Sequence, residues 1–243
     1  MIIAATVIVL LAGFVRAITG FGFALITAPL LLFIFDPQSV VVINVILGVL
    51  TGALLLLHTR HHIDVKRVLL MCSGSIFGIP IGVYLLSSLD PTVLKLVIAI
   101  LIIPFSIILL LGHSHQFRRD NLGCGISGFV SGLVGSSTSF SGPPVVLFLL
   151  NQGLVKERFI GTLTAYFLFT GVASVSAFSF IGMVTIDLLI KVAILLPTAV
   201  LGFYIGLKVQ PKIDAILFRK IVTSIISLAA LVIIATFLVS LIT

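Results

Sequence analysis

Residues 128–144 read GFVSGLVGSSTSFSGPP, and this run of small, hydroxyl and proline residues interrupts an otherwise apolar segment. Residues 13–29 read GFVRAITGFGFALITAP and share the same skeleton at a constant offset. A break in a membrane helix leaves backbone N–H and C=O groups without hydrogen-bond partners, and lipid cannot supply them. Such breaks therefore occur only where protein or a water-filled cavity surrounds them. Paired breaks in corresponding positions of two halves are typical of a substrate site in a membrane carrier. The identities pair Gly13, Phe14, Val15, Gly20 and Pro29 with Gly128, Phe129, Val130, Gly135 and Pro144.

The composition around these breaks is that of an integral membrane protein. Hydrophobic residues make up 60% of the chain and charged residues 9%, whereas a soluble domain carries roughly 25% charged residues. The apolar runs last about 20 residues, which predicts transmembrane helices and excludes the alternating strands of a barrel. The net charge of +7 comes from loops between these runs, so it indicates membrane topology and not nucleic-acid binding.

The eight apolar runs differ in length, and two of them exceed one crossing. The long runs, 2–35 and 122–150, either cross once with an irregular tail or fold back as a helix–break–helix hairpin. If every run crosses once, the Lys and Arg residues divide almost evenly between the two sides. If both long runs are hairpins, all loop cations except Lys95 and Lys191 lie on one side, as the positive-inside rule requires. The other runs are 38–57, 68–87, 92–111, 159–181, 185–207 and 216–242.

This arrangement predicts an all-α polytopic fold of two inverted repeats, 1–115 and 116–243. Each repeat has one re-entrant hairpin and three transmembrane helices, and both termini lie outside the cytoplasm. A second match supports the duplication: Gly78, Ile81, Gly82, Asp90 and Lys95 correspond to Gly202, Ile205, Gly206, Asp214 and Arg219. The G-x-x-x-G spacings favour close helix contact, either within one chain or in a homodimer.

Arg16 is the one basic residue deep in an apolar run. An arginine at the centre of a membrane helix costs roughly 2.5–3.5 kcal/mol on insertion scales, which makes it a candidate for function. No acidic residue neighbours it in sequence, and its planar donor fork suits an oxyanion. The competing interpretation is that Arg16 reaches the membrane interface along its aliphatic stem.

The breaks and one amide supply the other candidate binding groups. A broken helix exposes N–H donors that favour an anion, and hydroxyls add neutral donors. Packing by small residues is the alternative for the breaks, and an interhelical hydrogen bond is the alternative for Asn44. The predicted substrate-binding residues are Arg16, Thr19, Gly20, Gly22, Asn44, Gly135, Ser136, Ser137, Thr138, Ser139 and Ser141, with Pro29, Gly142, Pro143 and Pro144 shaping the hairpins.

The remaining reactive residues do not form a recognisable catalytic or metal site. His58, His61 and His62 lack a cysteine or carboxylate in ligand register, and no His, Asp or Glu constellation lies within the apolar runs. We therefore expect no enzymatic activity, no cofactor and no metal. The expected partners are the lipid bilayer and a small anion, and the sequence leaves open a coupling proton or ion.

The sequence resembles the TauE/SafE family, also called the toluene sulfonate uptake permease family. The resemblance lies in the GFV motif at residues 13–15 with the following GFG at residues 20–22, and in the second-half counterpart that ends in Gly142-Pro143-Pro144. The resemblance covers the whole chain in length and two-half organisation. It implies a secondary carrier of sulfite or organosulfonates such as sulfoacetate in the bacterial or archaeal inner membrane. We expect alternating access around the two hairpin tips, and an anion-selective channel is the alternative.

Overall fold

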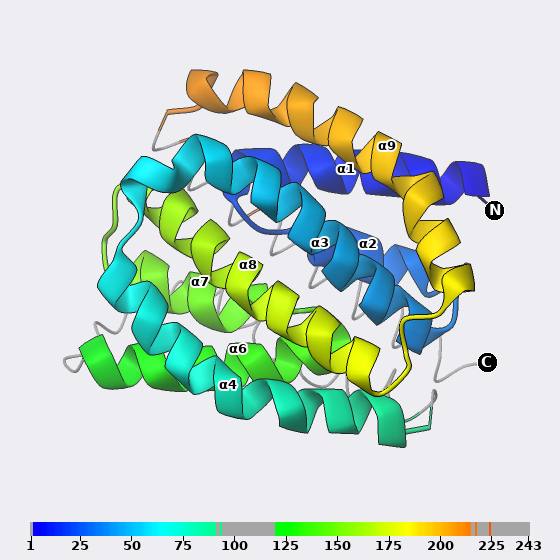
Figure 1. Ribbon diagram of the computed structural model, residues 1–243. Helices are drawn as coiled ribbons and strands as arrows, with labels where there is room; N and C mark the ends of the chain where they lie inside the picture. Colours follow the sequence, from blue (N-terminus) through cyan, green and yellow to red (C-terminus); the bar gives the residue numbers. More distant parts are fainter. Residues whose placement is uncertain (1, 91–92, 94–119, 215–216, 218–223, 225–243) are drawn as a thin grey trace.

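The computed structural model describes residues 2–90, 93, 120–214, 217 and 224, and this part of the chain is helical without strands (Figure 1). The predicted all-α class is therefore confirmed. Two of the predicted spans, 92–111 and 216–242, fall outside the described residues. The long helices are α1 (Ile2–Thr19), α3 (Pro37–Thr59), α4 (Val65–Ser88), α6 (Asp120–Thr138), α8 (Lys156–Phe180) and α9 (Ile186–Val209). The shorter elements are α2 (Phe23–Leu31), η1 (Arg60–His62), α7 (Gly142–Asn151) and η2 (Gln210–Lys212).

Side-chain caps fix where several helices begin. Asp36 accepts a hydrogen bond from the N–H of Ser39 at 2.8 Å, and Pro37 occupies the first turn of α3, where its missing N–H costs nothing. Thr185 caps α9 in the same way by accepting from the N–H of Leu188 at 3.3 Å. These residues separate one membrane-length helix from the next.

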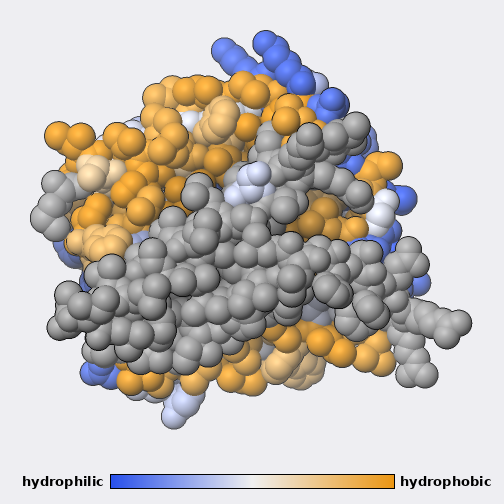
Figure 2. Space-filling model, turned by 180° about the vertical axis from the view of Figure 1, so that it is seen from behind, coloured by the Kyte–Doolittle hydropathy of each residue, from blue (hydrophilic) through white to orange (hydrophobic). Residues whose placement is uncertain are grey.

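Five of the described helical segments are long and apolar enough to cross a membrane: 2–19, 37–62, 65–88, 156–180 and 186–212. Large apolar side chains on them point outward, for example Phe77 at 71% exposure and Phe180 at 91%. Figure 2 shows that the described surface on one face is largely hydrophobic, with hydrophilic residues at its rim. Such a surface suits lipid and is unsuited to water.

The two breaks each turn the chain back on itself (Figure 1). Helix α1 begins at the end of the molecule where α2 finishes and α3 starts. Helix α6 begins at the opposite end, to which α7 returns and from which α8 departs. Helices α3, α4, α8 and α9 run between the two ends, so the α1–α2 and α6–α7 hairpins enter from opposite ends.

Glycine-lined contacts hold the long helices together in pairs, α4 against α6 and α1 against α9. A Cβ atom on Gly78 of α4 would strike the carbonyl of Phe129, and one on Gly202 of α9 would strike the carbonyl of Leu10. The backbones therefore touch because these positions carry no side chain. Of the two interpretations of the G-x-x-x-G spacings, the structure shows contact within one chain.

The two breaks have the same local hydrogen bonding. Thr19 Oγ1 donates to a carbonyl one turn earlier and accepts from the N–H of Phe21 at 3.3 Å. Thr138 makes the same pair of bonds, with the N–H of Phe140 at 3.3 Å. These bonds align Thr19 with Thr138, one helical turn from the alignment that pairs residues 13–29 with 128–144. The shift replaces the match of Gly13 with Gly128 by a match with Gly132, and it pairs Gly20 with Ser139 in place of Gly135.

Candidate functional site

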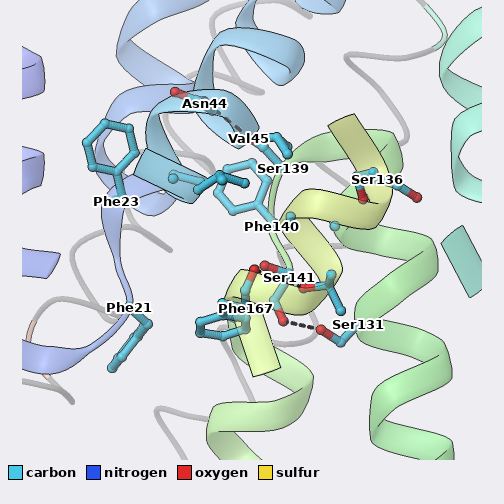
Figure 3. Close-up of a pocket in the computed structure, with 18 of the residues that line it drawn as sticks. Phe21, Phe23, Asn44, Val45, Ser131, Ser136, Ser139, Phe140, Ser141 and Phe167 are labelled. Atoms are coloured by element: carbon cyan, nitrogen blue, oxygen red, sulfur yellow. Dashed lines mark hydrogen bonds between the residues drawn. The ribbon is translucent and has the colours of Figure 1, made fainter. Parts of the chain in front are cut away.

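The two breaks border a cavity of about 70 Å³, which is room for several water molecules or one small anion. Figure 3 shows Phe21 and Phe23 on one side of it and Ser131, Ser136 and Ser141 on the other. Helices α3 and α8 complete the wall. The lining residues are Arg16, Phe21, Gly22, Phe23, Ala24, Leu25, Asn44, Val45, Gly48, Val49, Ser131, Gly132, Gly135, Ser136, Ser139, Phe140, Ser141, Gly142, Phe167, Thr170, Gly171 and Ser174.

Arg16 lies three residues before the end of α1 and is only 7% exposed. Its Nε has no hydrogen-bond partner, and none of the described Asp or Glu residues forms an ion pair with it. The guanidinium lies against α3, where Gly48 and Gly52 leave room for it. A buried cation without a counter-charge is costly, and its position in the cavity wall makes a bound anion the natural partner.

Asn44 connects α3 to the second break. Its Nδ2 donates to Ser139 Oγ at 3.3 Å, while its Oδ1 is buried without a hydrogen-bond partner (Figure 3). Ser139 has a φ of 65°, in the left-handed region that non-glycine residues seldom adopt. The corresponding position in the first break, Gly20, has a φ of 81°. Asn44 therefore fits both interpretations at once, because it forms an interhelical bond and also lines the cavity.

The hydroxyl groups near the second break mostly bond to the backbone. Ser131 Oγ donates to the carbonyl of Ser141 at 2.6 Å and joins α6 to the α6–α7 connection (Figure 3). Ser136 Oγ donates to the carbonyl of Gly132 at 2.7 Å and to that of Ile79 in α4 at 3.1 Å. Ser141 and Ser174 also line the cavity. The hydroxyl protons of Ser131 and Ser136 are therefore engaged. The candidate donors are Arg16, free N–H groups and the remaining lining hydroxyls, those of Ser139, Ser141 and Ser174.

The two returning helices differ in their free N–H groups. The first turn of α2 consists of Phe23, Ala24 and Leu25, which line the cavity. Their N–H groups have no intrahelical acceptor. The first turn of α7 contains Pro143 and Pro144, which have no N–H to donate. The helix-terminus donors expected at both tips are therefore concentrated at α2.

The structure brings together part of the predicted site. Eight of the predicted residues lie in the cavity wall: Arg16, Gly22, Asn44, Gly135, Ser136, Ser139, Ser141 and Gly142. The others are not among the lining residues, namely Thr19, Gly20, Pro29, Ser137, Thr138, Pro143 and Pro144. The hydroxyls of Thr19, Ser137 and Thr138 bond to carbonyls of their own helices. They stabilise the ends of α1 and α6.

Several lining residues were not predicted from sequence. Ser131 stands one turn before Gly135 on α6, and Gly48 stands one turn after Asn44 on α3. On α8, Ser174 stands one turn after Thr170. Since residues four apart share a helix face, extending the predictions at Gly135 and Asn44 by one turn would have found Ser131 and Gly48.

The described residues hold no group of three His, Cys, Asp or Glu that could bind a metal ion. Ion pairs among them lie near the helix ends, where Arg67 of α4 contacts Asp64 at 3.0 Å and Asp120 of α6 at 2.9 Å. Asp187 and Lys191 of α9 form another pair, at 2.7 Å. Among the described residues, the cavity thus contains one uncompensated cation, neutral donors and aromatic walls.

Comparison with known proteins places this chain by its sequence. No curated protein and no solved structure matches it. A family model described as "Sulfite exporter TauE/SafE" matches residues 5–233, which is nearly the whole chain. With its apolar membrane-length helices, the chain is a multi-pass membrane protein of a transporter family, and it belongs to the TauE/SafE sulfite exporter family.

Proposed function

We propose that this protein is a secondary transporter that carries sulfite or a small organosulfonate across the bacterial inner membrane. The observation that carries the proposal is Arg16, a 93% buried guanidinium without an acidic partner among the described residues, in the wall of a cavity between two helix breaks. The Arg16 guanidinium and the α2 N–H groups are hydrogen-bond donors without acceptors among the described residues. A sulfonate or sulfite group offers them oxygen acceptors. The cavity volume limits the organic part of the substrate to a short chain.

The helix contacts support two inverted repeats around this site. The contact of Gly202 with Leu10 in the α1–α9 pair has a counterpart in that of Gly78 with Phe129 in the α4–α6 pair. One turn further on, Gly206 meets Phe14 and Gly82 meets Leu133. These pairs follow the alignment that matches Thr19 with Thr138 and Gly78 with Gly202.

The charged ends support an orientation. The end at which α3, α7 and α9 finish carries Arg60, Lys66, Arg67, Lys156, Arg158, Lys208 and Lys212. The opposite end carries Lys191 among the described cations. By the positive-inside rule the first end is cytoplasmic, so the N-terminus lies outside. With an eighth segment at 216–242, the C-terminus lies outside as well.

In this arrangement the hairpins reach the cavity from opposite faces of the membrane. Each access path is bordered by a different hairpin, which is the geometry that alternating access uses. Movement of the α1–α2–α9 group relative to the α4–α6–α7 group would open one face and close the other around Arg16. Glycine contacts inside each group keep it rigid while it moves.

Counterflow in proteoliposomes tests the proposal. Vesicles loaded with unlabelled sulfite should accumulate radiolabelled sulfite transiently, and Arg16→Ala should abolish this exchange. Arg60→Ala, which removes an exposed loop arginine, is the matched control and should transport normally. A saturable exchange that Arg16→Ala leaves intact would refute the role of Arg16. Unitary currents without counterflow would identify an anion channel.

A further inference from the structure

The charge balance of the cavity suggests which ionic form of the substrate it accepts. Arg16 is the single cation among the described lining residues, and no carboxylate stands beside it. The α2 N-terminus adds the equivalent of roughly half a positive charge. Resting on the proposed function, we infer that the cavity binds its substrate as a monoanion, so that sulfite enters as hydrogen sulfite and a sulfonate enters in its ordinary singly charged form.

A doubly charged anion would carry more negative charge than Arg16 and the α2 N-terminus together can compensate. The wall opposite the serines includes the side chains of Phe21 and Phe23, which are 2% and 1% exposed and have no polar atom to solvate a second charge (Figure 3). Burial of an unpaired charge is strongly unfavourable, whereas a monoanion beside Arg16 is neutralised. The site therefore distinguishes one charge from two.

Asn44 provides an independent indication. Its Oδ1 is an acceptor without a donor partner, in a residue that is 2% exposed and lines the cavity. A fully ionised oxyanion, a sulfonate included, has only acceptors and leaves this oxygen without a donor. Hydrogen sulfite carries one proton that can be donated to it while the other oxygens face Arg16. The unpartnered acceptor is thus matched to a protonated anion.

The pH dependence of binding tests this inference on the wild-type protein. Calorimetric titration of the detergent-purified full chain should compare sulfite with methanesulfonate on both sides of the second pKa of sulfurous acid. Apparent affinity for total sulfite should fall about tenfold for each pH unit above that pKa, because the hydrogen sulfite fraction falls in that proportion. Methanesulfonate keeps its single charge, so its affinity should stay constant.

A variant isolates the contribution of the acceptor. Asn44→Leu keeps the approximate shape but removes Oδ1, and it should weaken sulfite binding by several-fold more than methanesulfonate binding. Loss of the bond to Ser139 affects both ligands, so the ratio of the two affinities is the readout. Asn121→Leu, at an exposed amide near the start of α6, is the matched control and should leave the ratio unchanged.

The outcomes separate this inference from the proposed function. Sulfite binding that is constant or increases with pH, while methanesulfonate also binds, would overturn the monoanion inference and leave the transporter proposal standing. Absence of binding by both ligands at every pH would overturn both. Sulfite binding that decreases with pH, with a constant methanesulfonate affinity, would support both.

Discussion

Nη2 of Arg16 lies 2.7 Å from the position that a Cβ atom would take on Gly52, so α3 accommodates this guanidinium because residue 52 is a glycine. One turn earlier, a Cβ on Gly48 would lie 3.5 Å from Nη1, which is an ordinary contact. The two glycines form a notch on α3 that determines where the charged group sits. Arg16 is therefore positioned by the absence of side chains on the neighbouring helix.

Substitution of Gly52 should change binding without harming the fold. In Gly52→Ala the new methyl group displaces the flexible end of Arg16, while alanine favours the helix by up to about 1 kcal/mol. We expect an unchanged or higher melting temperature and a sulfite affinity at least about tenfold lower, since hydrogen bonds to charged groups contribute about 1.5–3 kcal/mol each. Thermal unfolding and calorimetric titration measure the two effects separately.

Two variants calibrate that experiment. Gly48→Ala should weaken binding less than Gly52→Ala, because its methyl group fits beside Nη1. Gly125→Ala adds a methyl group to α6 with no atom within 4 Å and should leave affinity unchanged. Equal affinities in Gly52→Ala and Gly125→Ala would show that the notch does not position Arg16.

The first break should be sensitive to any side chain at residue 20. Gly20 has a φ of 81°, and a Cβ there would lie 3.2 Å from Cγ2 of Ile160 in α8. The left-handed conformation costs a non-glycine residue of order 1–3 kcal/mol, so Gly20→Ala should unfold at a lower temperature than the wild type. A melting temperature equal to that of Gly125→Ala would contradict the strained geometry assigned to this break.

The main features of the fold could be predicted from the sequence because lipid imposes strict rules. Apolar run length gave the helices, and the grouping of cations such as Arg60 and Lys156 favoured hairpins for the two long runs. The register of the proposed repeat could not be obtained in this way. The hydrogen bonds of Thr19 and Thr138 align the breaks, whereas from sequence Gly13 can be matched with Gly128 or with Gly132, four residues further on.

The candidate site could be predicted where a single polar or charged residue interrupts an apolar helix. Arg16 and Asn44 stand out in apolar helices, and both line the cavity. The hydroxyls of Ser137 and Thr138 were harder to place because their direction depends on the helical phase at the break. The donors expected at the α7 tip were also overestimated, because Pro143 and Pro144 have no backbone N–H.

The two glycine-lined helix pairs should respond alike to substitution. In Gly78→Ala the methyl group meets the Phe129 carbonyl, and in Gly202→Ala it meets the Leu10 carbonyl. Overpacking of this kind typically costs about 1–3 kcal/mol because backbones, not flexible side chains, must separate. Both variants should show lower melting temperatures than Gly125→Ala. A drop in only one of them would argue against equivalent pairs.

The proposed orientation predicts opposite labelling of two engineered cysteines. Arg60 lies at the basic end of the molecule and Ser87 near the other end of α4, and both are exposed. The native cysteines, Cys72 and Cys124, are buried and should react little. A membrane-impermeant maleimide should label Ser87→Cys in intact spheroplasts and Arg60→Cys only in inverted vesicles. Labelling of both from one face would contradict a membrane crossing by α4, and the reverse pattern would place the basic end outside.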